Sequence, residues 1–97
     1  MIVGACRVTL HLPEAHSLKD KRHVVKSMLA RLHNQFNVSA AEVEDQDLWQ
    51  RAVLGVAVVT NDTRHANEVL SSVVNFIRSA SLAAEMTDYE IDITPML

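Results

Sequence analysis

The sequence has few of the residues that mark secreted, membrane or disulfide-rich proteins. It has a single cysteine, Cys6, so no internal disulfide can form, and this usage is typical of a reducing compartment. Its longest uninterrupted apolar run, Val56–Val59, is far shorter than the ~18 residues that a membrane span needs. No basic segment followed by a long apolar core stands at the N-terminus, so no signal peptide is expected. These absences favour a cytoplasmic protein without a membrane partner.

Glycine and aromatic residues are also scarce, which bears on catalysis and on RNA recognition. The two glycines, Gly4 and Gly55, lie far apart, so no glycine-rich loop can cradle a phosphate. Aromatic residues make up 4% of the chain, too few for a sheet on which RNA bases stack. Asp45 and Asp47 could pair as an acid and a base, but they lie in a polar turn that is typical of solvent-exposed side chains. No zinc-ligand spacing occurs either, so we expect neither an enzyme nor a metal or other cofactor.

What is present is the composition of a small globular domain. The 97 residues include 48% apolar and 22% charged side chains, which fits a single domain spanning residues 1–97. The net charge of −3 is unevenly spread: residues 1–40 carry six lysines and arginines against two carboxylates, and residues 41–97 carry three against ten. This asymmetry predicts a dipolar surface that attracts anions at one side. The simpler interpretation is that the two halves neutralise each other within the fold or across a dimer.

Hydrophobic periodicity predicts six elements in the order β-α-β-β-α-β. Strands are expected over residues 2–12, 38–43 and 52–60, and a last strand around Tyr89–Ile93 that Pro95 stops. Helices are expected over residues 18–35 and after Asn61 and Asp62, which are candidate N-caps. Two such split units predict an α+β fold, the ferredoxin-like plait, with a four-stranded antiparallel sheet and two helices on one face.

The first helix shows the clearest local signals. Ser17 is a candidate N-cap, and Asp20 follows it three residues later in a loose capping box. An apolar face is expected to consist of Leu18, Val25, Leu29, Leu32 and Phe36, which recur at helical spacing.

The predicted topology places this helix start at the same end of the molecule as the hairpin between the second and third strands. Basic residues would then face acidic ones, namely Ser17, Lys19, Lys21 and Arg22 near Glu44, Asp45 and Asp47. The favoured interpretation is that these charges pair, at ~0–1 kcal/mol for each exposed pair. The alternative is an anion site formed by the helix N-terminus and the lysines.

Four ordered segments resemble the YlxP-like family, a small bacterial family of unknown function. They are residues 17–22 (SLKDKR), 36–43 (FNVSAAEV), 45–52 (DQDLWQRA) and 54–62 (LGVAVVTND), and the resemblance covers essentially the whole chain. It implies a ferredoxin-like fold, self-association and a bacterial cytoplasmic setting, and it brings no catalytic residue. Members are often encoded beside translation-initiation and ribosome-maturation genes, which implies a connection with RNA.

A row of cations on the first helix is the first candidate site. Lys19, Arg22, His23, Lys26 and His33 span about 100° of the helix surface beside the apolar face. Such a row meets a phosphate backbone through charge rather than by reading bases, so RNA or the ribosome is the expected partner and no DNA is expected. Together with the helix start, the predicted RNA- or anion-binding residues are Ser17, Lys19, Lys21, Arg22, His23 and Lys26. An ordinary solvated helix face is the alternative.

The face of the sheet that the helices leave open is the second candidate. The apolar side chains expected there are Val3, Ala5, Val53, Ala57 and Val59, if the third strand exposes that set. Because apolar sheet faces are usually covered by a partner, we expect a homodimer.

Trp49 is the large aromatic residue outside the core pattern, and it either packs against its own hairpin or anchors a partner. The sequence therefore favours a non-enzymatic, self-associating domain with an accessory role near RNA or the ribosome. The alternative is a regulatory domain that binds a small anion or ligand at the N-terminus of the first helix; an enzyme of unrecognised type has no support.

Overall fold

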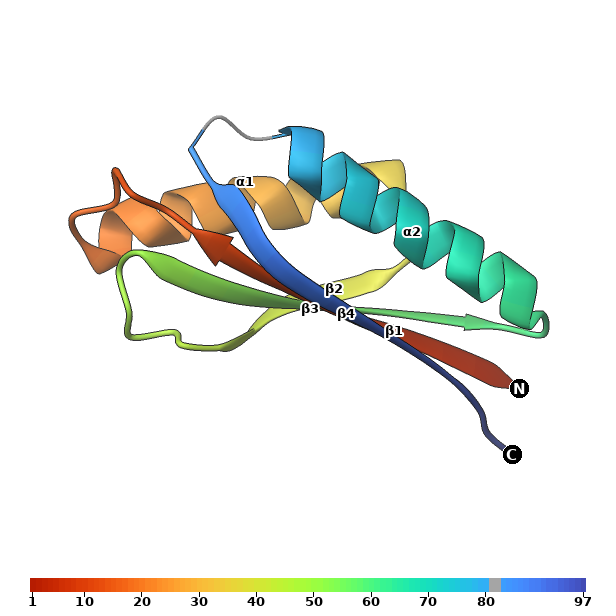
Figure 1. Cartoon of the computed structure of the whole chain (residues 1–97). Coiled ribbons are helices and arrows are strands. Elements are labelled where there is room, and N and C mark those ends of the chain that lie inside the picture. The colour runs from red at the N-terminus through yellow and green to blue at the C-terminus, as the bar shows by residue number, and fades with distance from the viewer. Residues whose placement is uncertain (81–82) are drawn as a thin grey trace.

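The computed structural model describes residues 1–80 and 83–97, and within them the elements follow the predicted order. They are β1 (Ile2–His11), α1 (Leu18–Gln35), β2 (Ser39–Glu44), β3 (Arg51–Thr60), α2 (Thr63–Ala80) and β4 (Glu85–Pro95). The four strands form an antiparallel sheet in the order β2-β3-β1-β4, and α1 and α2 both lie over the same face of it (Figure 1). The predicted α+β ferredoxin-like plait is confirmed.

The central strand β1 sets the register of the sheet. Cys6 of β1 lies between Val56 of β3 and Ile91 of β4, and its side chain faces the helices. The last strand is longer than the sequence predicted: Glu85 pairs with His11, beyond a bulge at Thr9 and Leu10. The ladder with β1 therefore extends β4 into residues that show no apolar alternation of their own.

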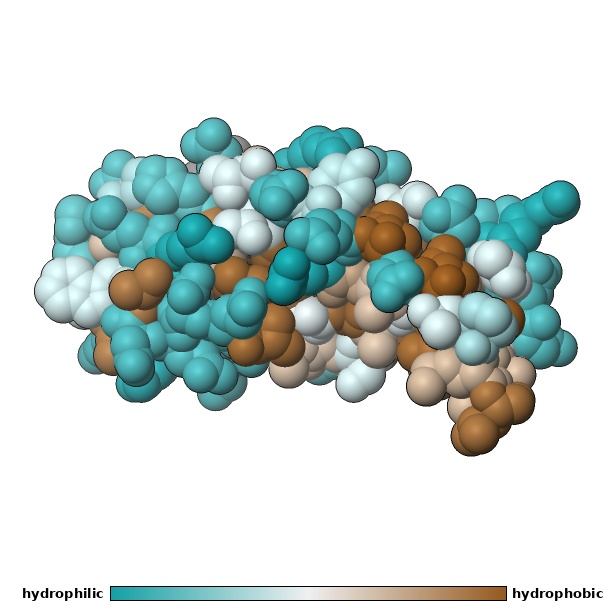
Figure 2. Space-filling model, turned by 60° about the horizontal axis from the view of Figure 1, so that its bottom comes forward, coloured by the Kyte–Doolittle hydropathy of each residue, from teal (hydrophilic) through white to brown (hydrophobic). Residues whose placement is uncertain are grey.

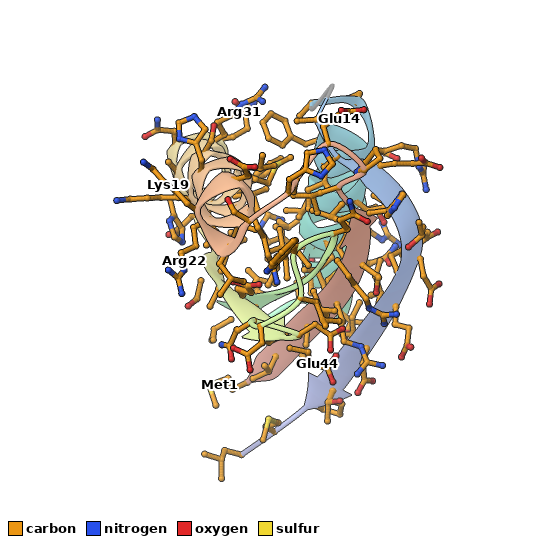
Figure 3. The ribbon with its side chains drawn as sticks, turned by 90° about the vertical axis from the view of Figure 1, so that its left-hand side faces the viewer. Met1, Glu14, Lys19, Arg22, Arg31 and Glu44 are labelled. Carbon is orange, nitrogen blue, oxygen red and sulfur yellow. The ribbon has the colours of Figure 1, made fainter. Side chains whose placement is uncertain are left out.

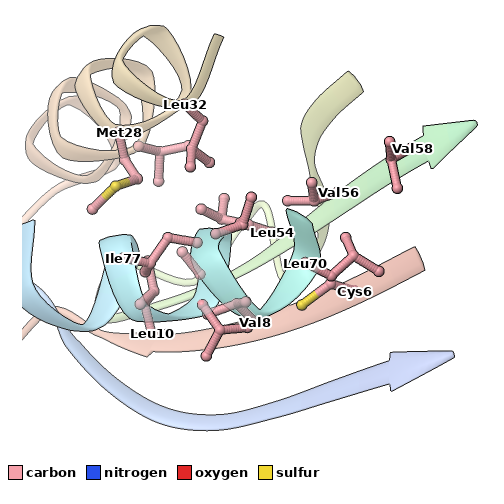
Figure 4. Close-up of a cluster of buried hydrophobic side chains, with 14 of the residues drawn as sticks. Cys6, Val8, Leu10, Met28, Leu32, Leu54, Val56, Val58, Leu70 and Ile77 are labelled. Atoms are coloured by element: carbon pink, nitrogen blue, oxygen red, sulfur yellow. The ribbon is translucent and has the colours of Figure 1, made fainter. Parts of the chain in front are cut away.

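The hydrophobic core lies between the sheet and the two helices (Figure 4). It includes Cys6, Val8 and Leu10 of β1, Leu54 and Val56 of β3, Met28 and Leu32 of α1, and Leu70 and Ile77 of α2. On α2 the buried residues are Ala66, Leu70, Val73, Val74 and Ile77. On α1 the buried residues are Lys21, Val25, Met28 and Leu32, whereas Leu18 and Leu29 are half-buried. The face of α1 turned to the core is thus rotated from the predicted one, and it includes a lysine.

The close approach of α2 to the sheet requires a glycine in β1. A Cβ atom added at Gly4 would stand 2.9 Å from Leu70 Cδ1 and 3.4 Å from Ala66 Cβ, both on α2. Gly4 therefore lets the helix pack directly on the backbone of β1.

The two ends of the molecule differ. The start of α1 and the β2–β3 hairpin lie together at one end, as the topology predicted, and the two termini lie at the other (Figure 1). At the terminal end the N–H of Met96 donates to the carbonyl oxygen of Met1 at 2.7 Å. Among the helices of residues 1–80 and 83–97, none has the length and apolar character needed to cross a membrane.

Candidate functional site

The N-terminus of α1 is capped by its own sequence, as predicted. Ser17 is the N-cap, and its Oγ accepts a hydrogen bond from the N–H of Asp20 at 3.0 Å. Asp20 Oδ2 in turn accepts from the N–H of His16 at 3.0 Å. The Ser17 side chain is therefore already engaged within the fold.

Lys21 is placed differently from the other cations of the helix. Lys21 is only 1% exposed. Its Nζ lies 2.8 Å from Glu42 Oε2 on β2 and also donates a hydrogen bond to the carbonyl oxygen of Asp45. The prediction that Lys21 is a surface cation like Lys19 is therefore corrected. Lys21 points inward because it lies on the side of α1 that faces the inner face of β2. The expected pairing of charges at this end does occur for Lys21, but with Glu42 rather than with a carboxylate of the turn.

Sequence reasoning missed Glu42, although a signal was present. Glu42 pairs with Leu54 in the ladder, and both share the face of the sheet that the helices cover. An acidic residue at an inward position of β2 and a lysine on the buried stripe of α1 are opposite charges that need each other.

Four of the other basic residues of α1 form what we call the basic row: Lys19, Arg22, His23 and Lys26. All four are exposed, and with Asp20 and Val24 they line a shallow surface hollow of about 500 Å³. None of the carboxylates in the described residues lies within ion-pair distance of Lys19, Arg22 or Lys26. Of the carboxylates nearby, Asp20 accepts from the N–H of His16, Glu42 pairs with Lys21, and Asp45 Oδ2 lies 2.7 Å from Arg51 Nε.

The basic row lies on the outer flank of α1. Arg31, on the other side of the helix, donates to the carbonyl oxygen of Ala80 at 2.7 Å and lies 5.3 Å from the centre of the Phe76 ring, both on α2. Lys19 and Arg22 project from the opposite flank, away from α2 (Figure 3). α1 packs over β2, whereas Asp88, Glu90 and Asp92 lie on β4 at the far edge of the sheet. These acidic side chains of β4 thus lie at the edge of the sheet opposite to the basic row.

One half of the open sheet face is covered by charged side chains. Arg7 of β1 donates to Glu90 Oε1 at 2.8 Å on β4, and its other terminal nitrogen lies 3.7 Å from Glu44 Oε2 on β2. The bond to Glu90 and the charges of Glu90 and Glu44 raise the pKa of the Arg7 guanidinium further above its ordinary value. Arg7 reaches Glu44 across β3, where its ladder partner is Gly55.

This ion pair explains a correction to the predicted apolar surface. Val53 stands on the open face as the alternation predicted, but it is 1% exposed. Arg7 is opposite Gly55 and Glu44 is opposite Val53, so the pair crosses β3 beside Val53 and shields it. The other predicted residues, Val3, Ala5, Ala57 and Val59, are exposed or half-buried, and Val59 is 65% exposed. Figure 2 shows apolar side chains gathered toward one end of the sheet side and polar ones toward the other.

A second hollow, of about 660 Å³, opens at the hairpin end of the molecule. It is lined by His11, His16, Asp47, Leu48, Trp49, Gln50 and Arg51. Trp49 is 52% exposed, so half of its surface does not pack against the hairpin. Although His11 and His16 meet in this hollow, no cluster of three possible metal ligands occurs in residues 1–80 and 83–97.

Cys6 is buried in the core at 3% exposure. Burial raises the pKa of its thiol from an ordinary 9.0 to about 11, so at neutral pH it stays protonated and a poor nucleophile.

Comparison with known proteins adds a family but no activity. Residues 3–91 match the family described as "Protein of unknown function (DUF503)". The chain is also 38% identical over 78 residues to the "Uncharacterized protein YlxP" of Bacillus subtilis (strain 168). The aligned residues make up 80% of this chain and 85% of that relative. These matches confirm the resemblance noted from the sequence segments.

Proposed function

Since the chain belongs to the DUF503 family, whose description assigns no activity, we propose from the geometry of the site that the basic row binds the phosphate backbone of RNA. One observation carries this proposal: Lys19, Arg22 and Lys26 are exposed on one flank of α1, and no carboxylate of the described residues lies within ion-pair distance of them. Cations without internal partners are free to replace the counterions of a polyanion.

The geometry of the row suits a backbone rather than a small ion. Lys19 and Lys26 are two helical turns apart, which is roughly 10 Å along the axis, and Arg22 lies between them. Several phosphates in succession can meet such a row, whereas one small anion would touch a single turn. The rival site at the helix N-terminus has less to offer, because Ser17 caps the helix and Lys21 is neutralised by Glu42.

The proposal is tested by the salt dependence of binding to a labelled single-stranded RNA of about eight nucleotides. With three phosphate contacts the logarithm of affinity should fall with the logarithm of salt at a slope of about −2, a roughly 20-fold loss between 50 and 200 mM. Fluorescence anisotropy measures both quantities. The double variant Lys19→Ala/Lys26→Ala should bring the slope to about −0.7.

A matched control separates the row from net charge. Arg64→Glu changes the net charge by the same two units, and Arg64 is exposed at the start of α2, away from the row. It should leave the slope unchanged. Absence of binding at low salt, or equal losses in the two variants, overturns the proposal.

Self-association through the open sheet face is a second function that we propose, on a separate observation. Val3 pairs with Val59 and Ala5 with Ala57, so the four side chains form one continuous apolar patch on the part of that face beyond Arg7, with Asp92 of β4 beside Ala5 at its edge. The whole face, four strands wide and about ten residues long, measures roughly 600 Å². A stable interface buries about 800 Å² on each partner, so we expect a dimer that dissociates on dilution.

Sedimentation equilibrium over a range of protein concentrations tests this second function. The average mass should rise above the 10.8 kDa of the monomer at high concentration. Val59→Asp should hold the mass at the monomer value, whereas Ser72→Asp, an equal charge change on the helical layer, should not. A monomer at every concentration, or the same behaviour in both variants, overturns it.

A further inference from the structure

The hollow at the hairpin end presents an aromatic ring on a fixed support. Trp49 and Leu48 are about half-exposed there, at 52% and 49%. The backbone on both sides of the ring is held: the Gln50 side chain donates to the carbonyl oxygens of Pro13 and Ala15, each at 3.2 Å, and the Leu48 N–H donates to Asp45 at 3.1 Å. Trp49 is thus a half-exposed indole whose two neighbouring residues are held by hydrogen bonds.

This hollow adjoins the start of the basic row. His16 lines it, Ser17 follows as the N-cap of α1, and Lys19 lies in the first turn of that helix. Figure 3 views this end of the molecule and shows Lys19 and Arg22 at its flank. A strand whose phosphates run from Lys26 to Lys19 therefore arrives at the rim of the hollow.

The combination has a known physical use. Proteins that bind single-stranded nucleic acid combine a cationic track for the backbone with aromatic side chains on which bases stack. A duplex is a poor fit, since each base inside it is already stacked on both faces. Of the charged groups that line the hollow, Arg51 is paired with Asp45 and Asp47 is an exposed carboxylate, so the hollow suits an uncharged base rather than a phosphate. The planar rings of His11 and His16 also line it.

We propose that Trp49 stacks on one base of a single-stranded RNA whose phosphates lie along the basic row. This inference rests on the proposed RNA binding and adds its substrate class, a single strand with an unpaired base. Because every base has an aromatic face, the contact tolerates any sequence and favours the larger purines.

The chain itself supplies the probe, because Trp49 is its only tryptophan. Adding an oligoadenylate of about eight nucleotides should quench the tryptophan emission, and the dissociation constant from this quenching should equal the one from anisotropy. An abasic oligomer of the same length should bind through the row without this quenching, about 5- to 150-fold more weakly. Trp49→Leu should lower the affinity for oligoadenylate by the same factor and leave the affinity for the abasic oligomer unchanged. Trp49→Phe should keep most of the affinity.

The outcomes distinguish the two proposals. If oligoadenylate binds in a lysine-dependent way but leaves the emission unchanged, and Trp49→Leu binds equally well, stacking is overturned and the basic row stands. Equal quenching by the abasic oligomer also overturns stacking. If anisotropy detects no RNA binding at low salt, both the proposed RNA binding by the basic row and the stacking on Trp49 are overturned. Circular dichroism of the Trp49 variants checks that they are folded. If Trp49→Leu is unfolded, the emission quenching of the native protein and the affinity of Trp49→Phe still test the stacking.

Discussion

Lys21 of α1 and Glu42 of β2 form a buried ion pair, with 2.8 Å between Nζ and Oε2, that joins the first helix to the edge strand of the sheet. The lysine side chain is 1% exposed and the glutamate side chain 18%. Glu42 Oε2 is buried and accepts no hydrogen bond from the residues that the structure describes, so the charge of Lys21 is what compensates it.

Removing only one partner of this pair should be costly. Lys21→Ala leaves a buried carboxylate without its cation, and we expect the free energy of unfolding to fall by about 3–5 kcal/mol. Lys21→Met/Glu42→Leu should cost much less, because no buried charge remains. Lys19→Ala, at an exposed position two residues away, should stay within about 0.5 kcal/mol of the native protein. Urea denaturation measures all three; a Lys21→Ala protein as stable as the Lys19→Ala protein contradicts the pair's role.

Gly55 should resist substitution because of what lies over it. A Cβ atom at residue 55 would stand 2.8 Å from Val43 Cγ1, too close for both to keep their places. Gly55→Ala should therefore destabilise the protein by about 1–3 kcal/mol.

Val43→Ala should rescue Gly55→Ala, since it removes the clashing methyl groups. A double-mutant cycle from thermal or urea unfolding should give a coupling above about 0.5 kcal/mol. Additive effects of the two substitutions would show that the contact between residues 43 and 55 is not the cause.

Asp62, rather than Asn61, should cap α2. Asp62 Oδ1 accepts a hydrogen bond from the N–H of Arg64 at 2.9 Å, which satisfies one of the free donors at the helix start. Asp62→Ala should lower the free energy of unfolding by about 1 kcal/mol, and Asn61→Ala, its neighbour, by less than about 0.5 kcal/mol. Equal losses in the two variants would show that the cap does not depend on the Asp62 side chain.

Cys6 should make the protein less stable at alkaline pH. Its thiol has a pKa of about 11 in the folded state against an ordinary 9.0, so above pH 9 the unfolded chain loses the proton more readily. The stability from this group is fully present below pH 9 and falls as pH rises toward 11, by about 2–3 kcal/mol in all.

The matched variant for this pH effect is Cys6→Ala, which has no thiol to ionise. The difference in unfolding free energy between the native protein and Cys6→Ala should shrink as pH rises from 9 to 11. A difference that is constant with pH would mean that the thiol is no harder to ionise in the folded protein.

Local pattern predicted the first helix well and the last strand less well. Ser17 supplied the cap and the apolar spacing supplied the length, so the predicted range of residues 18–35 is the observed Leu18–Gln35. Residues Glu85 and Met86 have no alternation to reveal them, and they become strand because β1 offers them hydrogen-bonding partners past its bulge. A strand imposed by a neighbour leaves no signal in its own residues.

The candidate surfaces were predicted in outline and corrected in detail. Val53 was assigned to the right face, because side chains alternate along a strand, but its exposure depends on an arginine from another strand. Lys21 was grouped with the surface cations because lysines are seldom buried. The sequence singled out Trp49 but not the hollow beside it. That hollow forms where the β2–β3 hairpin lies close to His11 at the end of β1 and to His16, the residue before the N-cap of α1.

The sequence by itself determined the order of the elements, the extent of the first helix and the excess of cations on that helix. These are local properties, set by periodicity, capping residues and composition. The tertiary structure decided which charges remain at the surface and which are neutralised. Lys21 and Glu42, or Arg7, Glu44 and Glu90, interact through space across elements far apart in the chain. Because an electrostatic interaction depends on the distance between charges and on their burial, only the folded chain separates the basic row from the lysine beneath it.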